Sequence, residues 1–127
     1  MKRREVMVEG LAEPLSHYAD AVVAGDTLYV SGIVPVDASG AVVGDDVVAP
    51  ARQVFAIMER VLAAAAATPA DVVKVTVYLV DPRYREPVYR VMGRRLKGVH
   101  PVSTGIVVSA LARPEWLVEI DATAVLA

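Results

Sequence analysis

The sequence predicts a single α/β domain over residues 1–127, built on a six-stranded, mostly antiparallel sheet in the order β-β-β-α-β-α-β-β. Two stretches carry apolar residues at helical spacing, and short runs rich in Val, Ile and Thr precede, separate and follow them. Two helices can cover only one face of such a sheet, yet the strands keep apolar residues on both faces. We therefore expect the uncovered face to pack against other copies of the chain.

The first three strands are predicted in the first third of the chain. Residues 5–10 alternate weakly and are typical of an edge strand. Residues 20–25 and 27–32 are two β-rich runs that meet at Gly25 and Asp26, which predicts a hairpin. Residues 37–40 form a further turn, with Gly40 suited to a left-handed backbone.

The period changes to that of a helix at Asp46, and this helix is predicted to end at Thr68 and Pro69. Its apolar stripe recurs at intervals of three and four: Ala51, Val54, Met58, Val61, Leu62 and Ala65. Pro50 is compatible with the first turn. A second helix has Pro87 in its first turn and Gly98 at its end, with Val88, Val91, Met92 and Leu96 as its stripe.

The remaining strands are predicted at residues 71–81, 103–110 and 117–126. In the last of them Glu119 and Asp121 point away from the apolar positions, so two carboxylates share one side of the strand. A lone Glu in a strand is more often a solvated edge residue. Because this sheet is expected to be mostly buried, a working carboxylate that acts as a base or holds a water is a real alternative.

Three further groups have both an ordinary and a functional interpretation. Ser103 and Gly105 share a face of their strand, and if that face is also the face of Glu119, Ser103 and Glu119 line one pocket. His17 and Tyr18 lie in a loop, which is either surface or a cover over the pocket. The arginine-rich face of the second helix is either solvated or an anion patch; it carries Arg85, Arg90 and Arg94.

The composition argues against several classes of function. The chain has no cysteine, and its two histidines are far apart, so neither thiolate chemistry nor a metal site is expected. No phosphate-binding Gly-rich loop is present, so no cofactor is predicted. A net charge of −2 does not favour a nucleic-acid partner, and no apolar run is long enough to span a membrane. The basic start lacks an apolar stretch, which makes a cytoplasmic location the default expectation.

Several motifs together resemble the YjgF/RidA family of reactive-intermediate deaminases. They are "YADAVVAGDTLYVSGIVPVD", "ARQVFAIMERVLAAA", "DVVKVTVYLVD", "HPVST" and "LVEIDATA", in family order from about Tyr18 to Ala124. The resemblance implies a chorismate-mutase-like fold and a homotrimer with sites in the clefts between subunits. It also implies hydrolysis of enamines and imines to 2-oxo acids and ammonia, with no metal or organic cofactor.

The resemblance extends to individual site residues. Tyr18 matches the family's loop tyrosine, Ser31 and Gly32 match its Ser-Gly pair, and Glu119 matches the glutamate that orients the attacking water. The departures are equally specific. Ser103, followed by Thr104, stands where the family has the arginine that binds the substrate carboxylate; Gly105 replaces a residue that is often Cys, and Tyr89 stands where many members have Asn. A serine cannot replace a bidentate guanidinium.

Four hypotheses remain open. The first is an enzyme of altered specificity that uses Glu119, with His17 as a second acid or base, on an imine, an enamine or a related intermediate. The second is a trimer that binds a metabolite without turnover. The third is ordinary deamination of 2-iminobutanoate or 2-iminopropanoate, with an arginine of the second helix replacing the lost one; Arg90 projects about 100° away from Tyr89, which argues against that residue. The fourth, a ribonuclease or translation inhibitor, is disfavoured by the acidic charge.

Overall fold

The computed structural model describes residues 2–127, which form one six-stranded sheet and two helices. The strands are β1 (Arg3–Val6), β2 (Ala21–Ala24), β3 (Thr27–Ile33), β4 (Val72–Leu79), β5 (Val102–Val107) and β6 (Val118–Val125). The helices are α1 (Val48–Ala64) and α2 (Arg85–Arg95), and a short 3-10 turn precedes β4 (η1, Pro69–Asp71) and another precedes α2 (η2, Pro82–Tyr84). The predicted order of elements is confirmed.

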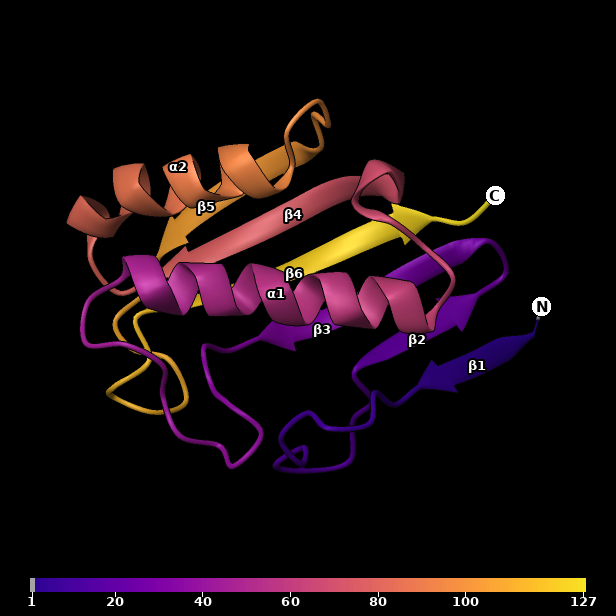
Figure 1. Cartoon of the computed structure of the whole chain (residues 1–127), viewed down its shortest axis with the longest axis horizontal. Coiled ribbons are helices and arrows are strands. Elements are labelled where there is room, and N and C mark those ends of the chain that lie inside the picture. The colour runs from indigo at the N-terminus through magenta and orange to yellow at the C-terminus, as the bar shows by residue number, and fades with distance from the viewer. Residues whose placement is uncertain (1) are drawn as a thin grey trace.

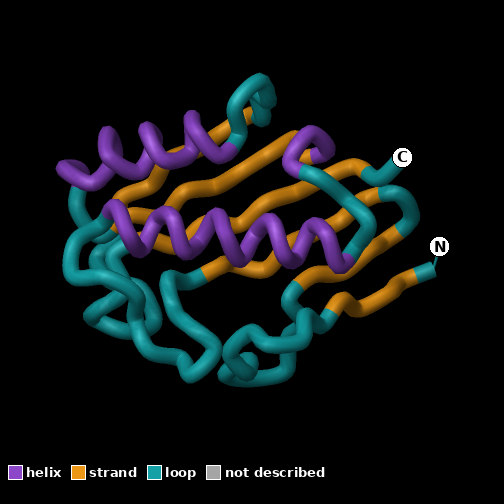
Figure 2. The backbone as a smooth tube through the Cα atoms, in the orientation of Figure 1, coloured by secondary structure: helices purple, strands orange, loops and turns teal. Residues whose placement is uncertain are grey.

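The strands lie in the order β1-β2-β3-β6-β4-β5, so β6 is central and β1 and β5 form the edges. All neighbours are antiparallel except β4 and β5, which are joined through α2 and run parallel. Both helices cross the same face of the sheet, and α1 lies across its middle while α2 lies along β5 (Figure 1). Figure 2 shows the loops gathered mainly at one end of the strands. The prediction of a mostly antiparallel sheet covered on one face is confirmed.

The first helix begins where local hydrogen bonds fix the chain. The Asp46 carboxylate accepts from the backbone N–H groups of Val48 and Ala49, at 3.0 and 3.3 Å, and so satisfies donors that the helix itself leaves unpaired. Pro50 falls in the first turn, where its missing N–H costs nothing. The predicted apolar stripe is buried together with Phe55. Full burial of each large side chain contributes roughly 1.5–3 kcal/mol of transfer free energy.

Alternation along β4 and β6 separates the two faces of the sheet. Val75 and Val77 of β4, and Val118 and Ile120 of β6, are fully buried beneath the helices. Glu119 and the other odd-numbered residues of β6 lie on the opposite face, which no helix covers (Figure 1). Several large apolar or aromatic side chains on that open face are exposed: Tyr29, Val102, Ile106 and Val125. The predicted alternation is confirmed.

The first strand differs from its prediction. It spans Arg3–Val6 rather than residues 5–10, because β2 offers only four residues for pairing and Arg3 meets Ala24 at the end of that register. Gly10, with φ of +86°, lies in the turn that follows. Residues 7–20 form a loop, which is tied down where the Val8 N–H donates to the Asp20 carboxylate at 2.8 Å.

No helix in residues 2–127 is long and apolar enough to cross a membrane.

Candidate functional site

Two carboxylates and a tyrosine meet on the open face of the sheet. Glu119 lies opposite Tyr78 in the pairing of β6 with β4, and Asp121 follows two residues later on the same face. The Tyr78 hydroxyl donates a hydrogen bond to the Asp121 carboxylate at 3.2 Å. Burial, followed by the charge of Asp121, raises the pKa of the Tyr78 hydroxyl.

Glu119 is partly buried, and its environment favours the protonated form. Burial is the main cause that raises the pKa of the Glu119 carboxyl, and the negative charge of Asp121 raises it further. A carboxyl group in such a place is suited to exchanging a proton at a pH closer to neutral than an exposed one. Perturbed carboxyl groups are also common at functional sites.

Gly32 of β3 makes room for the Glu119 carboxylate. A Cβ atom at position 32 would lie 3.0 Å from the Glu119 Cδ atom and closer still to its Oε2 atom. Only glycine therefore fits beneath the carboxylate as it now lies. The preceding residue, Ser31, donates its backbone N–H to the Asp20 carbonyl at 3.0 Å. The Ser-Gly pair and the glutamate, which are far apart in sequence, thus come together in the fold.

The polar residues of β5 divide between the two faces. Ser103 and Gly105 pair with Val75 and Val77 of β4, which face the helices, whereas Thr104 lies on the open face with Glu119. Ser103 and Glu119 therefore lie on opposite faces of the sheet. The sequence analysis expected Ser103 and Glu119 to line one pocket if they shared a face, so within a single chain they do not line one pocket.

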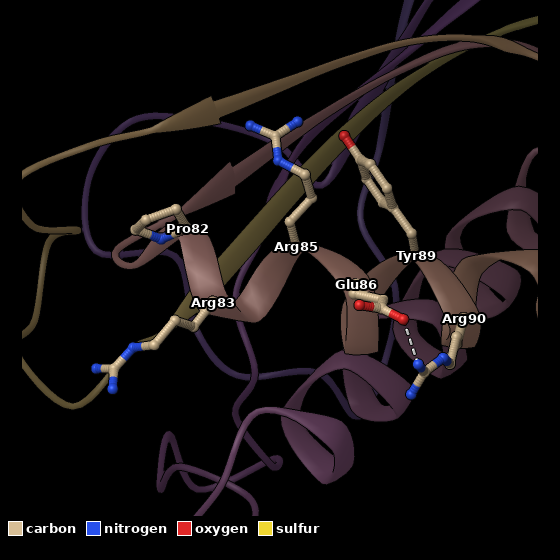
Figure 3. A pocket seen from close by; sticks show the side chains of 6 residues that line it. All are labelled: Pro82, Arg83, Arg85, Glu86, Tyr89 and Arg90. Carbon is tan, nitrogen blue, oxygen red and sulfur yellow. Dashed lines mark hydrogen bonds and ion pairs between the residues drawn. The ribbon is translucent and has the colours of Figure 1, made fainter.

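Gly105 plays the same spatial role on the helix face as Gly32 plays on the open face. A Cβ atom at position 105 would lie 3.0 Å from Nη1 of Arg85 and closer still to the hydroxyl of Tyr89. Both side chains come from α2 and reach towards β5 (Figure 3). The Arg85 guanidinium lies 5.9 Å from the centroid of the Tyr89 ring, in a cation–π contact.

An open cavity of about 660 Å³ surrounds the first turns of α2. It is lined by Pro82, Arg83, Arg85, Glu86, Tyr89 and Arg90, and Figure 3 shows these six side chains. Glu119 is not among them. This cavity and the carboxylate cluster are consequently separate features of the single chain.

His17 and Tyr18 are exposed in the loop between β1 and β2. They line a second hollow, of about 540 Å³, together with residues of β1 and its loop. The Tyr18 hydroxyl accepts a hydrogen bond from the Leu15 N–H at 3.2 Å. Neither Glu119 nor Ser103 lines this hollow. The structure thus brings Gly32 to Glu119 and Tyr89 to Gly105, but does not bring His17 or Tyr18 to either group within one chain.

Two side chains at these clusters were not assigned a role by the sequence. Tyr78 belongs to a strand that is otherwise apolar, and only its register against β6 shows that it reaches Asp121. The sequence places Arg85 on the arginine-rich face of the second helix, either solvated or an anion patch, but does not single it out or pair it with Tyr89. Its spacing of four from Tyr89, which places both on one helix face, was the available signal.

Comparison with known proteins gives a consistent result over nearly the whole chain. The family model described as Endoribonuclease L-PSP matches residues 10–126. A RutC family protein of Pyrococcus horikoshii is 32% identical, covering 94% of each chain. The 3-aminoacrylate deaminase RutC of Acinetobacter baylyi is 29% identical, covering 98% of each chain. The human 2-iminobutanoate/2-iminopropanoate deaminase is 30% identical, covering 97% of this chain and 90% of the human one.

Solved structures agree with the sequence comparison. The crystal structure of a Mycobacterium tuberculosis member of the YjgF/YER057c/UK114 family superposes with a TM-score of 0.86 at 31% identity. The match covers 98% of this chain and all of the other. The chain therefore belongs to the family described as endoribonuclease L-PSP, which is the YjgF/RidA family that its motifs resemble.

Proposed function

We propose that this chain is a divergent RidA-family enzyme that hydrolyses an imine or an enamine, with Glu119 as the group that orients and deprotonates water. The observation that carries the proposal is the partly buried Glu119 carboxyl, which lies over Gly32 with its pKa raised. Such a carboxylate is a stronger base than an exposed one, and general-base catalysis of this kind contributes typically 10²- to 10⁴-fold in rate. Two deaminases among the relatives support this class of reaction.

The proposed reaction balances without an external electron donor. Glu119 takes a proton from water as the water oxygen bonds to the C=N carbon, and it passes that proton to the nitrogen, which gives a neutral carbinolamine. Glu119 then takes the proton of the new hydroxyl and passes it to the nitrogen as the C–N bond breaks, so C=O forms and the nitrogen leaves as ammonia. An enamine enters the same sequence after tautomerising to the imine. We propose that neither a metal nor an organic cofactor takes part.

We further propose that a homotrimer completes the cleft. Glu119 and Ser103 lie on opposite faces of one chain, so a site that uses both needs residues from a second copy. The open face carries exposed apolar residues, Tyr29 and Ile106 among them, and burying them against another copy of the chain would favour association. In such an assembly the exposed loop with His17 and Tyr18 would reach a neighbouring cleft, where His17 supplies a second acid or base and Tyr18 a hydroxyl.

We propose that the substrate is not a standard 2-imino acid whose carboxylate is bound by the residue at position 103. A serine offers one neutral hydroxyl at that position, whereas a guanidinium offers two parallel, charge-assisted hydrogen bonds to a carboxylate. Ser31, Gly32, Tyr89, Thr104 and Gly105 are proposed to line the substrate cleft with Ser103.

Two alternatives each have an observation in their favour. Loss of the arginine at position 103 with retention of the cleft residues also fits a trimer that binds a metabolite without converting it. The human relative's name favours ordinary deamination of 2-iminobutanoate or 2-iminopropanoate. The net charge of −2 gives no comparable support to a nucleic-acid partner.

The test is the hydrolysis of 2-iminobutanoate, generated in place by an amino-acid oxidase, by wild type, Ser103→Arg and Ser103→Arg/Glu119→Gln. We expect slow turnover by wild type, an increase of about tenfold or more with Ser103→Arg, and loss of that gain in the double variant. Glu115→Gln in the Ser103→Arg background, at an exposed position, controls for removal of a negative charge. Unchanged activity after loss of Glu119 would exclude the proposed base, and wild-type activity equal to that of Ser103→Arg would exclude the proposed substrate difference.

A further inference from the structure

The guanidinium of Arg85 has no acidic partner among residues 2–127, unlike the two arginines that flank it. Arg83 forms an ion pair with Asp81 at 2.6 Å, which holds the pKa of that carboxyl at about 2. Arg90 forms an ion pair with Glu86, one helical turn earlier. Arg85, in the same open cavity, makes no ion pair or hydrogen bond within this range. Its charge therefore remains available for an external anion.

The orientation of Arg85 is set by its neighbours on α2 and β5. Arg85 and Tyr89 are four residues apart and so occupy one face of the helix. Figure 3 shows both extending towards the strands, while Arg83, Glu86 and Arg90 point away from them. The guanidinium packs over the Tyr89 ring, at 5.9 Å from its centroid, and this contact holds the charged plane near the phenol hydroxyl.

The space in which these two groups meet depends on the absence of a side chain at position 105. Nη1 of Arg85 lies 3.0 Å from where a Cβ of residue 105 would be, and the Tyr89 hydroxyl lies closer still. Ser103, two residues earlier in β5, has its side chain on the same face, because it pairs with Val75 as Gly105 pairs with Val77. A planar guanidinium, a phenol hydroxyl and a serine hydroxyl thus border one stretch of edge strand.

We propose that Arg85, with Tyr89, binds a carboxylate of the substrate from helix α2, at a different place from the one that an arginine at position 103 would occupy. The donor set fits this anion, because guanidinium N–H groups bind a carboxylate bidentately and the phenol adds one more donor. The identity of the ligand as substrate depends on the proposed function, whereas the binding of a carboxylate does not. Gly105 is then the residue that admits this second source of positive charge.

The experiment is a calorimetric titration of the full-length protein with 2-oxobutanoate, and with the uncharged 2-oxobutanamide as the comparison ligand. We expect Arg85→Gln to raise the Kd for 2-oxobutanoate about tenfold to a hundredfold, the range for a lost charge-assisted hydrogen bond, and to leave the Kd for the amide unchanged. Tyr89→Phe should raise the Kd for the acid by a smaller factor. Arg94→Gln is the matched control, because it removes the same charge nine residues later, half a turn around the helix and outside the cavity lining.

Each result decides the proposal. Selective weakening of acid binding by Arg85→Gln supports it. Equal binding of acid and amide by wild type, unchanged binding of the acid by Arg85→Gln, or an equal loss with Arg94→Gln overturns it. The titration involves no turnover, so a failure of Glu119 in the hydrolysis assay leaves its result intact. Conversely, if Arg85→Gln binds 2-oxobutanoate as tightly as wild type does, the hydrolysis assay still tests the role of Glu119 independently.

Discussion

Gly32 on the open face and Gly105 on the helix face can be compared directly, because neither has a positive φ and each lies beneath functional groups. Their conformation does not require glycine, but the space above them does. Over Gly32 lies the end of a flexible carboxylate, and over Gly105 lie a rigid phenol ring and a guanidinium stacked on it. The difference predicts two kinds of cost: an added methyl group at position 32 can push the end of a flexible side chain aside, whereas at position 105 it must move a whole ring.

The largest expected effect is a loss of hydrolysis rate when Gly32 is replaced. Gly32→Ala should lower kcat/KM for imine hydrolysis by about a hundredfold, because the new methyl group displaces the Glu119 carboxylate from its place. Stability should change little, since the displaced atoms end a flexible side chain. The measurement is hydrolysis of 2-iminobutanoate together with urea unfolding. Gly93→Ala on α2, where a Cβ meets nothing within 4 Å, is the matched control, and full activity of Gly32→Ala would refute the prediction.

Replacement of Gly105 should, in contrast, lower the stability of the fold more than the rate of hydrolysis. Gly105→Ala should destabilise the fold by roughly 1–3 kcal/mol, the usual cost of overpacking, because the Tyr89 hydroxyl can move away only if the whole ring moves. Urea unfolding of Gly105→Ala measures this cost. Repeating it in a Tyr89→Ala background should remove most of the penalty, because the clashing hydroxyl is gone. A penalty that persists without Tyr89 would show that the space above Gly105 is not what requires glycine.

The comparison also shows what the sequence could and could not predict. Period-3.6 and period-2 patterns located both helices and most strands, and the alternation of β6 placed Glu119 away from the core. The start of β1 was missed by two residues because its pairing length is set by β2. The face of Ser103 relative to Glu119 could not be predicted either. It depends on the registers of β5 with β4 and of β4 with β6, which no local pattern encodes.

A third prediction concerns the hydrogen bond that links β4 to β6 on the open face. Tyr78→Phe removes the donor to Asp121 and should destabilise the fold by roughly 0.5–1.5 kcal/mol, towards the lower end because the pair is only partly buried. Tyr29→Phe is the control, since Tyr29 lies on the same face and is 53% exposed. Equal unfolding free energies for Tyr78→Phe and Tyr29→Phe would mean that this bond contributes nothing to the fold.

The smallest expected effect is the pH dependence of stability that comes from Glu119. Burial raises the folded-state pKa of this carboxyl above its ordinary value of 4.5, so between the two values the folded chain binds more protons than the unfolded chain. Stability contributed by this group is therefore fully present below the unfolded pKa and is lost as the pH rises through the folded pKa. Glu119→Gln removes the titration, so the variant should gain stability relative to wild type as the pH rises from 4 towards 7.

The measurement is urea unfolding of wild type and Glu119→Gln at a series of pH values across that interval. Glu115→Gln, at an exposed position, controls for the change in net charge. A difference between wild type and Glu119→Gln that stays constant with pH would show that burial does not perturb this carboxyl. The open face would then hold Glu119 only as a solvated residue, and the contrast with the rigid Tyr89–Arg85 pair would lose its chemical meaning.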